Sequence, residues 1–90
     1  MIRDRGLNLR IEEVEIPRAS ALAGKTLRDS RIRDVTDALV LAIRSKQKGG
    51  GFQYNPGPDT VLEGGTTLVL LGRTVSVAKL RAALAKGFDA

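Results

Sequence analysis

The sequence predicts a small α+β domain with the element order β-α-β-β-β-α. Three observations support this class. Apolar residues alternate with polar ones over residues 7–16, the period of a half-buried strand. Two further runs of strand length, residues 38–43 and 66–71, are aliphatic and lie next to glycine-containing turns. Near the end of the chain, apolar residues recur at helical spacing, which predicts one amphipathic helix.

The first strand changes phase along its length. Its apolar residues occupy odd-numbered positions up to Ile11 and even-numbered positions from Val14. A shift by one residue is typical of a β-bulge, which we expect at residues 12–13. Pro17 ends the strand because proline has no amide hydrogen to donate.

The stretch after this strand, ASALAGKT at residues 19–26, is one residue away from the nucleotide phosphate loop G-x-x-x-x-G-K-[ST]. A working phosphate loop also needs a distant strand ending in an aspartate for magnesium, and neither apolar run ends in one. We therefore interpret Gly24 as a turn residue, Lys25 as solvated and Thr26 as the N-cap of a short helix over residues 27–34, with Asp29 as its capping partner.

The middle of the chain predicts a hairpin. Residues 38–43, ALVLAI, form an unbroken apolar run, typical of a strand buried on both faces or lying at an interface, and Arg44 ends it. Residues 48–51, KGGG, suit a flexible turn, and residues 52–55 alternate like a returning strand. Residues 56–59, PGPD, form a further turn.

The last third predicts a strand and a helix. A glycine turn at residues 64–65 precedes the strand at residues 66–71, which Gly72 closes. Thr74 or Ser76 is expected to cap the final helix. The apolar stripe of that helix consists of Val77, Leu80, Leu84 and Phe88.

Composition excludes several functional classes. The 90 residues contain no Cys and no His, which removes disulfides, thiolate nucleophiles, imidazole catalysis and most zinc sites. No catalytic pair and no metal cluster stands out, so we expect neither enzymatic activity nor a bound metal. No apolar run reaches the roughly 20 residues of a membrane span. The net charge of +5 is spread along the chain, as on a solvated surface.

Five motifs in order resemble the C-terminal domain of regulators of K⁺ conductance, the RCK-C or TrkA-C domain. The opening strand and turn of this family resemble residues 14–27, VEIPRASALAGKTL, of the chain. The family's next strand resembles residues 40–44, VLAIR. A glycine hairpin follows, then PGPDTVL at residues 56–62. The last motif usually contains Gly-Asp, where this chain has Gly followed by Thr66.

This resemblance implies a homodimeric, ligand-sensing domain at residues 7–88, with residues 1–6 as a leader or linker. Similar domains regulate potassium channels and transporters in the cytoplasm, attached through an N-terminal RCK lobe to an inner-membrane transport protein. In several of them the ligand is cyclic di-AMP, held across the two-fold axis. The matching positions are Leu39, Val40, Leu41, Arg44, Phe52, Gln53 and Tyr54.

The chemistry of these positions agrees with such a ligand. Arg44 can pair with a phosphodiester, Phe52 or Tyr54 can stack on a purine, and Gln53 can bond a base edge. Two alternatives remain at this point. The apolar residues can form a purely structural dimer interface, or the basic charge can serve a nucleic-acid-binding module with Phe52 and Tyr54 on its sheet. We expect no nucleic-acid partner, because the charge forms no basic stripe.

Overall fold

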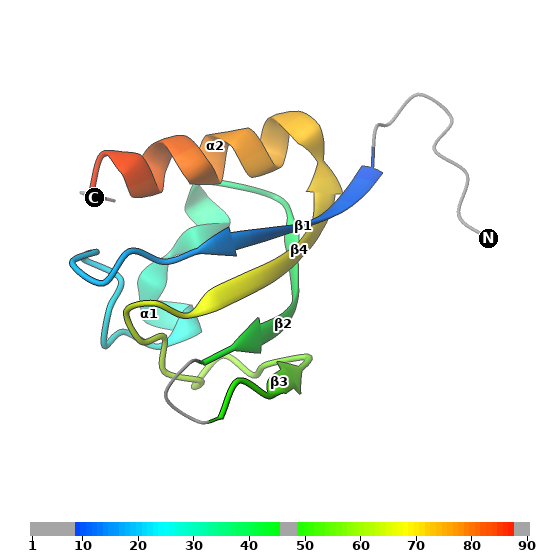
Figure 1. Ribbon diagram of the computed structural model, residues 1–90. Coiled ribbons are helices and arrows are strands. Elements are labelled where there is room, and N and C mark those ends of the chain that lie inside the picture. Colours follow the sequence, from blue (N-terminus) through cyan, green and yellow to red (C-terminus); the bar gives the residue numbers. More distant parts are fainter. Residues whose placement is uncertain (1–8, 46–48, 88–90) are drawn as a thin grey trace.

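The computed structural model describes residues 9–45 and 49–87 and confirms the predicted α+β class. A four-stranded sheet is packed with two α-helices and one 3₁₀ helix (Figure 1). The elements are β1 (Leu9–Glu15), α1 (Leu27–Ser30), η1 (Ile32–Asp34), β2 (Leu39–Arg44), β3 (Phe52–Tyr54), β4 (Thr67–Arg73) and α2 (Thr74–Ala85).

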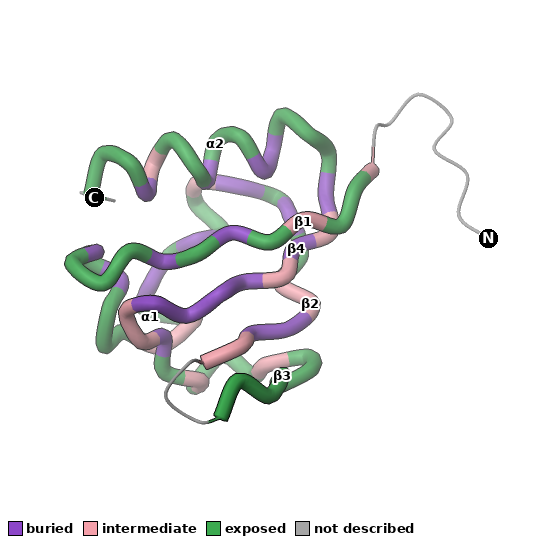
Figure 2. Tube along the Cα trace, in the orientation of Figure 1, coloured by how far each residue is buried: buried purple, intermediate pink, exposed green. Residues whose placement is uncertain are grey.

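The sheet is antiparallel throughout, with strand order β1-β4-β2-β3. The predicted hairpin is present as β2 and β3. Of its predicted turn at residues 48–51, residue 48 lies outside the described part of the chain, as do residues 46–47 before it. The central strand β4 pairs with β1 on one side and β2 on the other. Because it has a neighbour on each side, β4 is buried or partly buried along most of its length (Figure 2).

The predicted bulge in β1 is wrong. The pairing of β1 with β4 runs without a shift from Leu9 opposite Arg73 to Glu15 opposite Thr67. Without a bulge, Ile11 points to one face of the sheet and Val14 to the other. The apolar phase changes because both faces carry apolar residues, and the register shift lies in β2 instead.

The predicted helix over residues 27–34 is broken in two. Thr26 caps α1 as expected, because its hydroxyl accepts a 3.1 Å hydrogen bond from the Asp29 amide. The helix then stops at Arg31, whose φ of 57° lies in the left-handed region. The chain continues as η1, whose Ile32 enters the core.

Gly72 lies within β4, whereas the sequence placed it at the strand's end. A Cβ added at Gly72 would lie only 2.8 Å from the Ala38 Cβ. The close approach of the segment before β2 therefore requires a glycine at this position.

Neither Thr74 nor Ser76 caps α2, which begins at Thr74 after Arg73 without a side-chain cap. The Ser76 hydroxyl instead donates a short hydrogen bond to the Asp37 carboxylate. This bond is the largest cause that lowers the pKa of Asp37 below its usual value. Desolvation acts in the opposite direction, and the attraction of Arg73 lowers the pKa further. The contact joins the start of α2 to the segment before β2.

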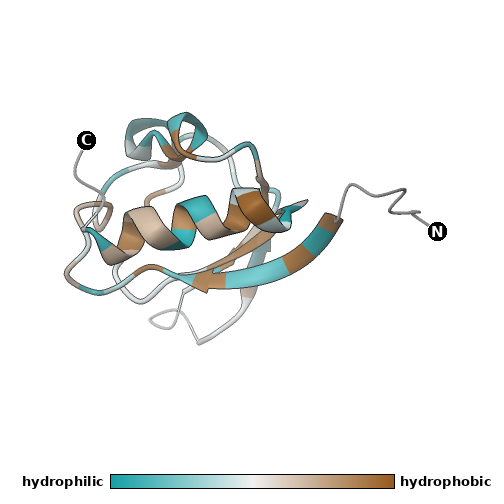
Figure 3. Ribbon diagram, turned by 90° about the horizontal axis from the view of Figure 1, so that it is seen from above, coloured by the Kyte–Doolittle hydropathy of each residue, from teal (hydrophilic) through white to brown (hydrophobic). Residues whose placement is uncertain are grey.

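The core lies between the sheet and the helical elements, on the face that carries Val14, Ile43, Leu68 and Leu70. The stripe of α2 contributes Val77, Leu80 and Leu84, as predicted, while Phe88 lies outside the described residues. Figure 3 shows α2 running above the sheet, with its most apolar residues at its start.

The other face of the sheet has no element of the described chain in front of it (Figures 1 and 3). We call this the open face. Its residues are Leu9, Ile11 and Glu13 of β1; Thr67, Val69 and Leu71 of β4; Leu39, Ala42 and Arg44 of β2; and Phe52 and Tyr54 of β3.

Candidate functional site

The structure divides the seven predicted site residues among three places. Leu39, Val40 and Leu41 line a groove of about 720 Å³ between β2 and the segment containing α1 and η1. Arg44, Phe52 and Tyr54 lie in a row on the open face. Gln53 points to the opposite face of β3 from Phe52 and Tyr54, and it lies neither in the groove nor in this row.

The row on the open face follows from the register of the hairpin. Arg44 is paired with Phe52, and Ala42 with Tyr54, so their side chains share one face. The Arg44 guanidinium lies 5.4 Å from the centre of the Phe52 ring. The Phe52 and Tyr54 rings are stacked with centroids 5.9 Å apart and planes inclined by 26°. We call these three residues the aromatic row.

The aromatic row is accessible to a ligand. Phe52 is 42% exposed and Tyr54 75% exposed, although each is a large apolar group. Arg44 is paired with the Glu13 carboxylate at 3.8 Å, and pairs of this exposure contribute little stability. The row therefore presents a π surface beside a weakly engaged cation, which suits a purine linked to a phosphate.

Gln53 points to the other side of β3. Its side-chain amide donates a 3.4 Å hydrogen bond to the Thr60 hydroxyl. Because strand residues alternate, Gln53 cannot share a face with Phe52 and Tyr54. The structure thus separates it from the aromatic row on the same protomer.

The β2 side of the groove coincides with an irregularity in the strand. Val40 lies opposite Leu70 and Ala42 opposite Val69, so Leu41 is the extra residue of a β-bulge. The bulge places Leu39 and Ala42 on the open face, while Leu41 lines the groove. Leu41 is only partly buried there.

Arginines line the opposite wall of the groove, and the sequence prediction missed them. They are Arg28, Arg31 and Arg33. Arg28 pairs with Asp59 at 2.9 Å and Arg31 with Asp34 at 2.8 Å. The repeated arginines of RDSRIRD, residues 28–34, were a signal for this wall. The sequence predicted one helix over residues 27–34 and no role for these arginines, whereas the structure breaks the helix at Arg31.

The Gly24-Lys25-Thr26 stretch does not form a phosphate loop. Two of its amides are already bonded within the domain: Gly24 donates to the Leu62 carbonyl at 2.7 Å, and Lys25 to that of Leu22 at 3.0 Å. A phosphate cradle needs such amides free to point at the ligand. Gly24, with a φ of 89°, serves the turn, as expected.

The described residues offer no group of three or more acidic residues that could hold a metal ion. Within the same ranges, no helix has the length and apolarity needed to cross a membrane.

Comparison with known proteins identifies the family. Residues 11–85 match the TrkA-C domain. No curated protein matches the chain. Among solved structures, the GsuK channel bound to NAD is 25% identical with a TM-score of 0.74, over 88% of this chain and 14% of that one.

Two structures with cyclic di-AMP also match. The RCK C domain of the potassium transport protein KtrA is 25% identical with a TM-score of 0.68, over 82% of this chain and 81% of that one. The RCK_C domain dimer of S. agalactiae BusR is 24% identical with a TM-score of 0.74, over 84% of this chain and 96% of that one, and shares the fold. BusR has also been solved with promoter DNA.

The family match at residues 11–85 includes β2, β3, β4 and α2 and most of β1. The chain spans only a small part of the GsuK channel but most of the KtrA domain. Because the family match covers residues 11–85 of 90, the chain belongs to the TrkA-C domain family, the C-terminal domains of RCK proteins.

Proposed function

We propose that this domain is a ligand-sensing and dimerisation unit of a protein that regulates potassium transport. The observation that carries the proposal is the TrkA-C match over residues 11–85. The similarity to the GsuK channel and to the domain of the potassium transport protein KtrA supports the same proposal. In this proposal an N-terminal RCK lobe of the parent chain attaches the domain, in the cytoplasm, to an inner-membrane channel or transporter.

The proposed ligand is cyclic di-AMP. The KtrA domain, which is 25% identical, has been solved with this molecule. The aromatic row supplies a stacking surface for an adenine, and Arg44 supplies a cation for a phosphodiester. The groove lined by Leu39, Val40 and Leu41 adds an apolar wall on the same strand. Gln53 and the two parts of the site are expected to act together only when two protomers pair.

A homodimer fits the open face. Ile11 is 66% exposed and Leu39 46% exposed, so large aliphatic side chains there lack cover from the described chain. A second copy would bury them, which is favourable by about 25 cal/mol per Å² of apolar surface. Cyclic di-AMP is itself two-fold symmetric, and a symmetric ligand suits an isologous interface.

The expected mechanism is a population shift between dimer arrangements. A ligand can move an attached gate only by the difference between its affinities for the two arrangements. The domain needs no catalytic group for this task, so we expect no enzymatic activity. The regulated transport belongs to the parent protein.

Arg44→Ala tests the ligand site. Loss of a charged hydrogen bond costs about 1.5–3 kcal/mol, which corresponds to roughly 10- to 150-fold weaker binding. Isothermal titration calorimetry with cyclic di-AMP measures this change. Arg10→Ala is the matched control, because Arg10 is an exposed arginine of β1 outside the groove and the aromatic row.

Equal affinity of Arg44→Ala and the unaltered domain would remove Arg44 from the site. Absence of binding by the unaltered domain, with a dimeric mass in light scattering, would favour a purely structural dimerisation module. The exposed apolar residues of the open face support that second function. A steeply salt-dependent affinity for single-stranded RNA would instead favour the nucleic-acid-binding alternative.

A further inference from the structure

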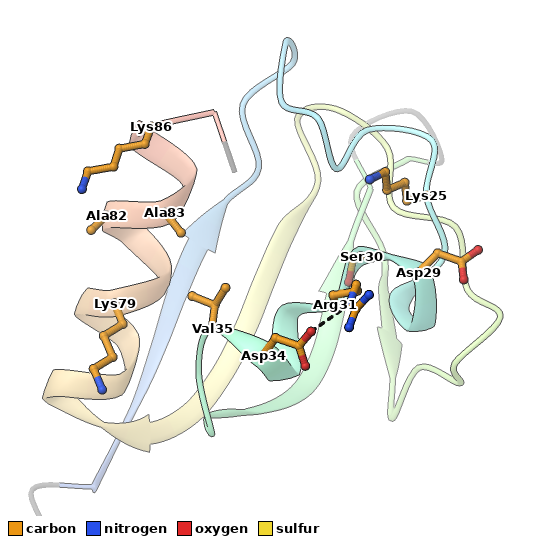
Figure 4. Close-up of a pocket in the computed structure, with 10 residues that line it drawn as sticks. All are labelled: Lys25, Asp29, Ser30, Arg31, Asp34, Val35, Lys79, Ala82, Ala83 and Lys86. Atoms are coloured by element: carbon orange, nitrogen blue, oxygen red, sulfur yellow. Dashed lines mark hydrogen bonds and ion pairs between the residues drawn. The ribbon is translucent and has the colours of Figure 1, made fainter. Parts of the chain in front are cut away.

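A second hollow, separate from the aromatic row, lies between α2 and the segment containing α1 and η1. Its volume is about 830 Å³, within the range of small-molecule sites. Val35, Ala82 and Ala83 give it an apolar lining. Figure 4 shows Val35 between α2 on one side and Lys25 with Arg31 on the other. We call this space the lysine hollow.

All three lysines of residues 9–45 and 49–87 line this hollow, namely Lys25, Lys79 and Lys86. No ion pair joins any of them to a carboxylate within those ranges. The arginines differ, because five of them have carboxylate partners there. In the part of the chain that the structure describes, many arginines are thus paired with carboxylates, whereas the lysines line one space without such partners.

The hollow has an excess of positive charge. Its lining contains four cations, the three lysines and Arg31, against two carboxylates, Asp29 and Asp34, which leaves two positive charges. Asp34 is already engaged by Arg31 at 2.8 Å. Asp29 is therefore the one carboxylate of the lining left to offset three lysines.

Local structure places the lysines around a shallow floor. Lys79 lies on α2 and Lys86, seven residues later, is the C-cap that follows it, so both lie on one side of the helix, with the small residues Ala82 and Ala83 between them. In Figure 4 their side chains extend along the outer edge of α2. Lys25 stands opposite, and its carbonyl accepts a 2.7 Å hydrogen bond from Leu62. Flexible lysine stems can turn inward over a bound anion.

We propose that the lysine hollow binds a nucleoside polyphosphate. The apolar lining receives the flat base, and the lysines act as point charges toward the phosphates. This mode needs no free backbone amides, which the Gly24 turn has already used. The proposal does not depend on cyclic di-AMP binding, because none of the seven residues proposed for that ligand lines the hollow.

The test is a titration of the ¹⁵N-labelled 90-residue chain with ATP, without magnesium, followed by two-dimensional NMR. We expect saturable shifts of the amides of Lys25, Ala83 and Lys86. Tripolyphosphate should compete, and adenosine should leave the spectrum unchanged. Lys79→Gln combined with Lys86→Gln should weaken ATP binding at least about tenfold, because two charged contacts are lost.

Arg10→Gln combined with Arg18→Gln is the matched control, since it removes the same charge from exposed residues that do not line the hollow. We expect its affinity to change less than about threefold, the effect of screened long-range attraction. Equal weakening by both double variants would overturn the proposal. So would shifts confined to Leu39–Leu41 or the aromatic row, or shifts that never saturate. Dispersed spectra of each variant confirm that the fold is intact.

Discussion

Single residues explain where this fold tolerates no change. Gly72 and Ala38 touch across the junction between β4 and the segment before β2, and Gly64 has a similar constraint against the Arg18 backbone. The sequence predicted a glycine turn at residues 64–65, which the structure contains. It could not predict why Gly72 is a glycine, because the reason is a contact between residues 34 positions apart.

Gly72→Ala should destabilise the domain by about 1–3 kcal/mol, the usual cost of overpacking a filled site. The added Cβ would come 2.8 Å from the Ala38 Cβ and 3.0 Å from its Cα. Urea unfolding measures the change in the free energy of unfolding. Combining it with Ala38→Gly should recover part of the loss, because the nearer of the two contacts disappears.

Gly57→Ala is the control for this pair, since a Cβ at Gly57 meets nothing within 4 Å. It should change stability little. If Gly72→Ala behaves like Gly57→Ala, the close approach does not limit this position.

At the scale of elements, the strands were easier to predict than the helical segment and the bulge. Alternation and apolar runs identify β1, β2 and β4, because burial on a sheet face leaves a period of two. The break at Arg31 leaves no such trace, since no glycine or proline marks it. The bulge was assigned to β1 because a change of phase looks the same whether the strand shifts or both faces are apolar.

The Arg31→Gly variant should have a higher free energy of unfolding than the Arg31→Ala variant. The left-handed conformation costs a residue with a Cβ about 1–2 kcal/mol, and glycine avoids this cost. Both substitutions remove the exposed ion pair with Asp34, so their difference isolates the backbone term. Thermal or urea unfolding of the two variants provides the comparison.

In a helix interior the order is opposite, and an alanine variant is about 1 kcal/mol more stable than a glycine variant. That result would mean that residues 27–34 form one continuous helix in solution.

At the scale of the whole molecule, the sequence identified the family but not the geometry of the site. The motifs placed Leu39, Val40, Leu41, Arg44, Phe52, Gln53 and Tyr54 together through the resemblance. The structure distributes them over the groove, the open face and the opposite side of β3. Spacing along a chain cannot show this division, because the bulge at Leu41 and the alternation of β3 decide it.

Ile11→Asp should dissociate the proposed dimer without unfolding the domain. Ile11 is 66% exposed on the open face, so a charge there has little effect on the protomer but would be desolvated in an apolar interface. Light scattering at high micromolar concentration should change from a dimeric to a monomeric mass. Val75→Asp is the control, because Val75 is comparably exposed but lies on α2.

A monomeric mass for the unaltered domain would contradict the dimer itself. A dimer that survives Ile11→Asp would instead place the interface on another surface.

Arg31 and Asp34 line both the groove and the lysine hollow. The segment from α1 to η1 is therefore a wall with a cavity on each side. A molecule that reorients this ion pair from one side changes the surface offered on the other. If occupancy of one cavity alters the affinity of the other, thermodynamic reciprocity requires the reverse effect to have the same factor. The shared ion pair therefore gives a domain of 90 residues a route by which two chemical signals can be combined.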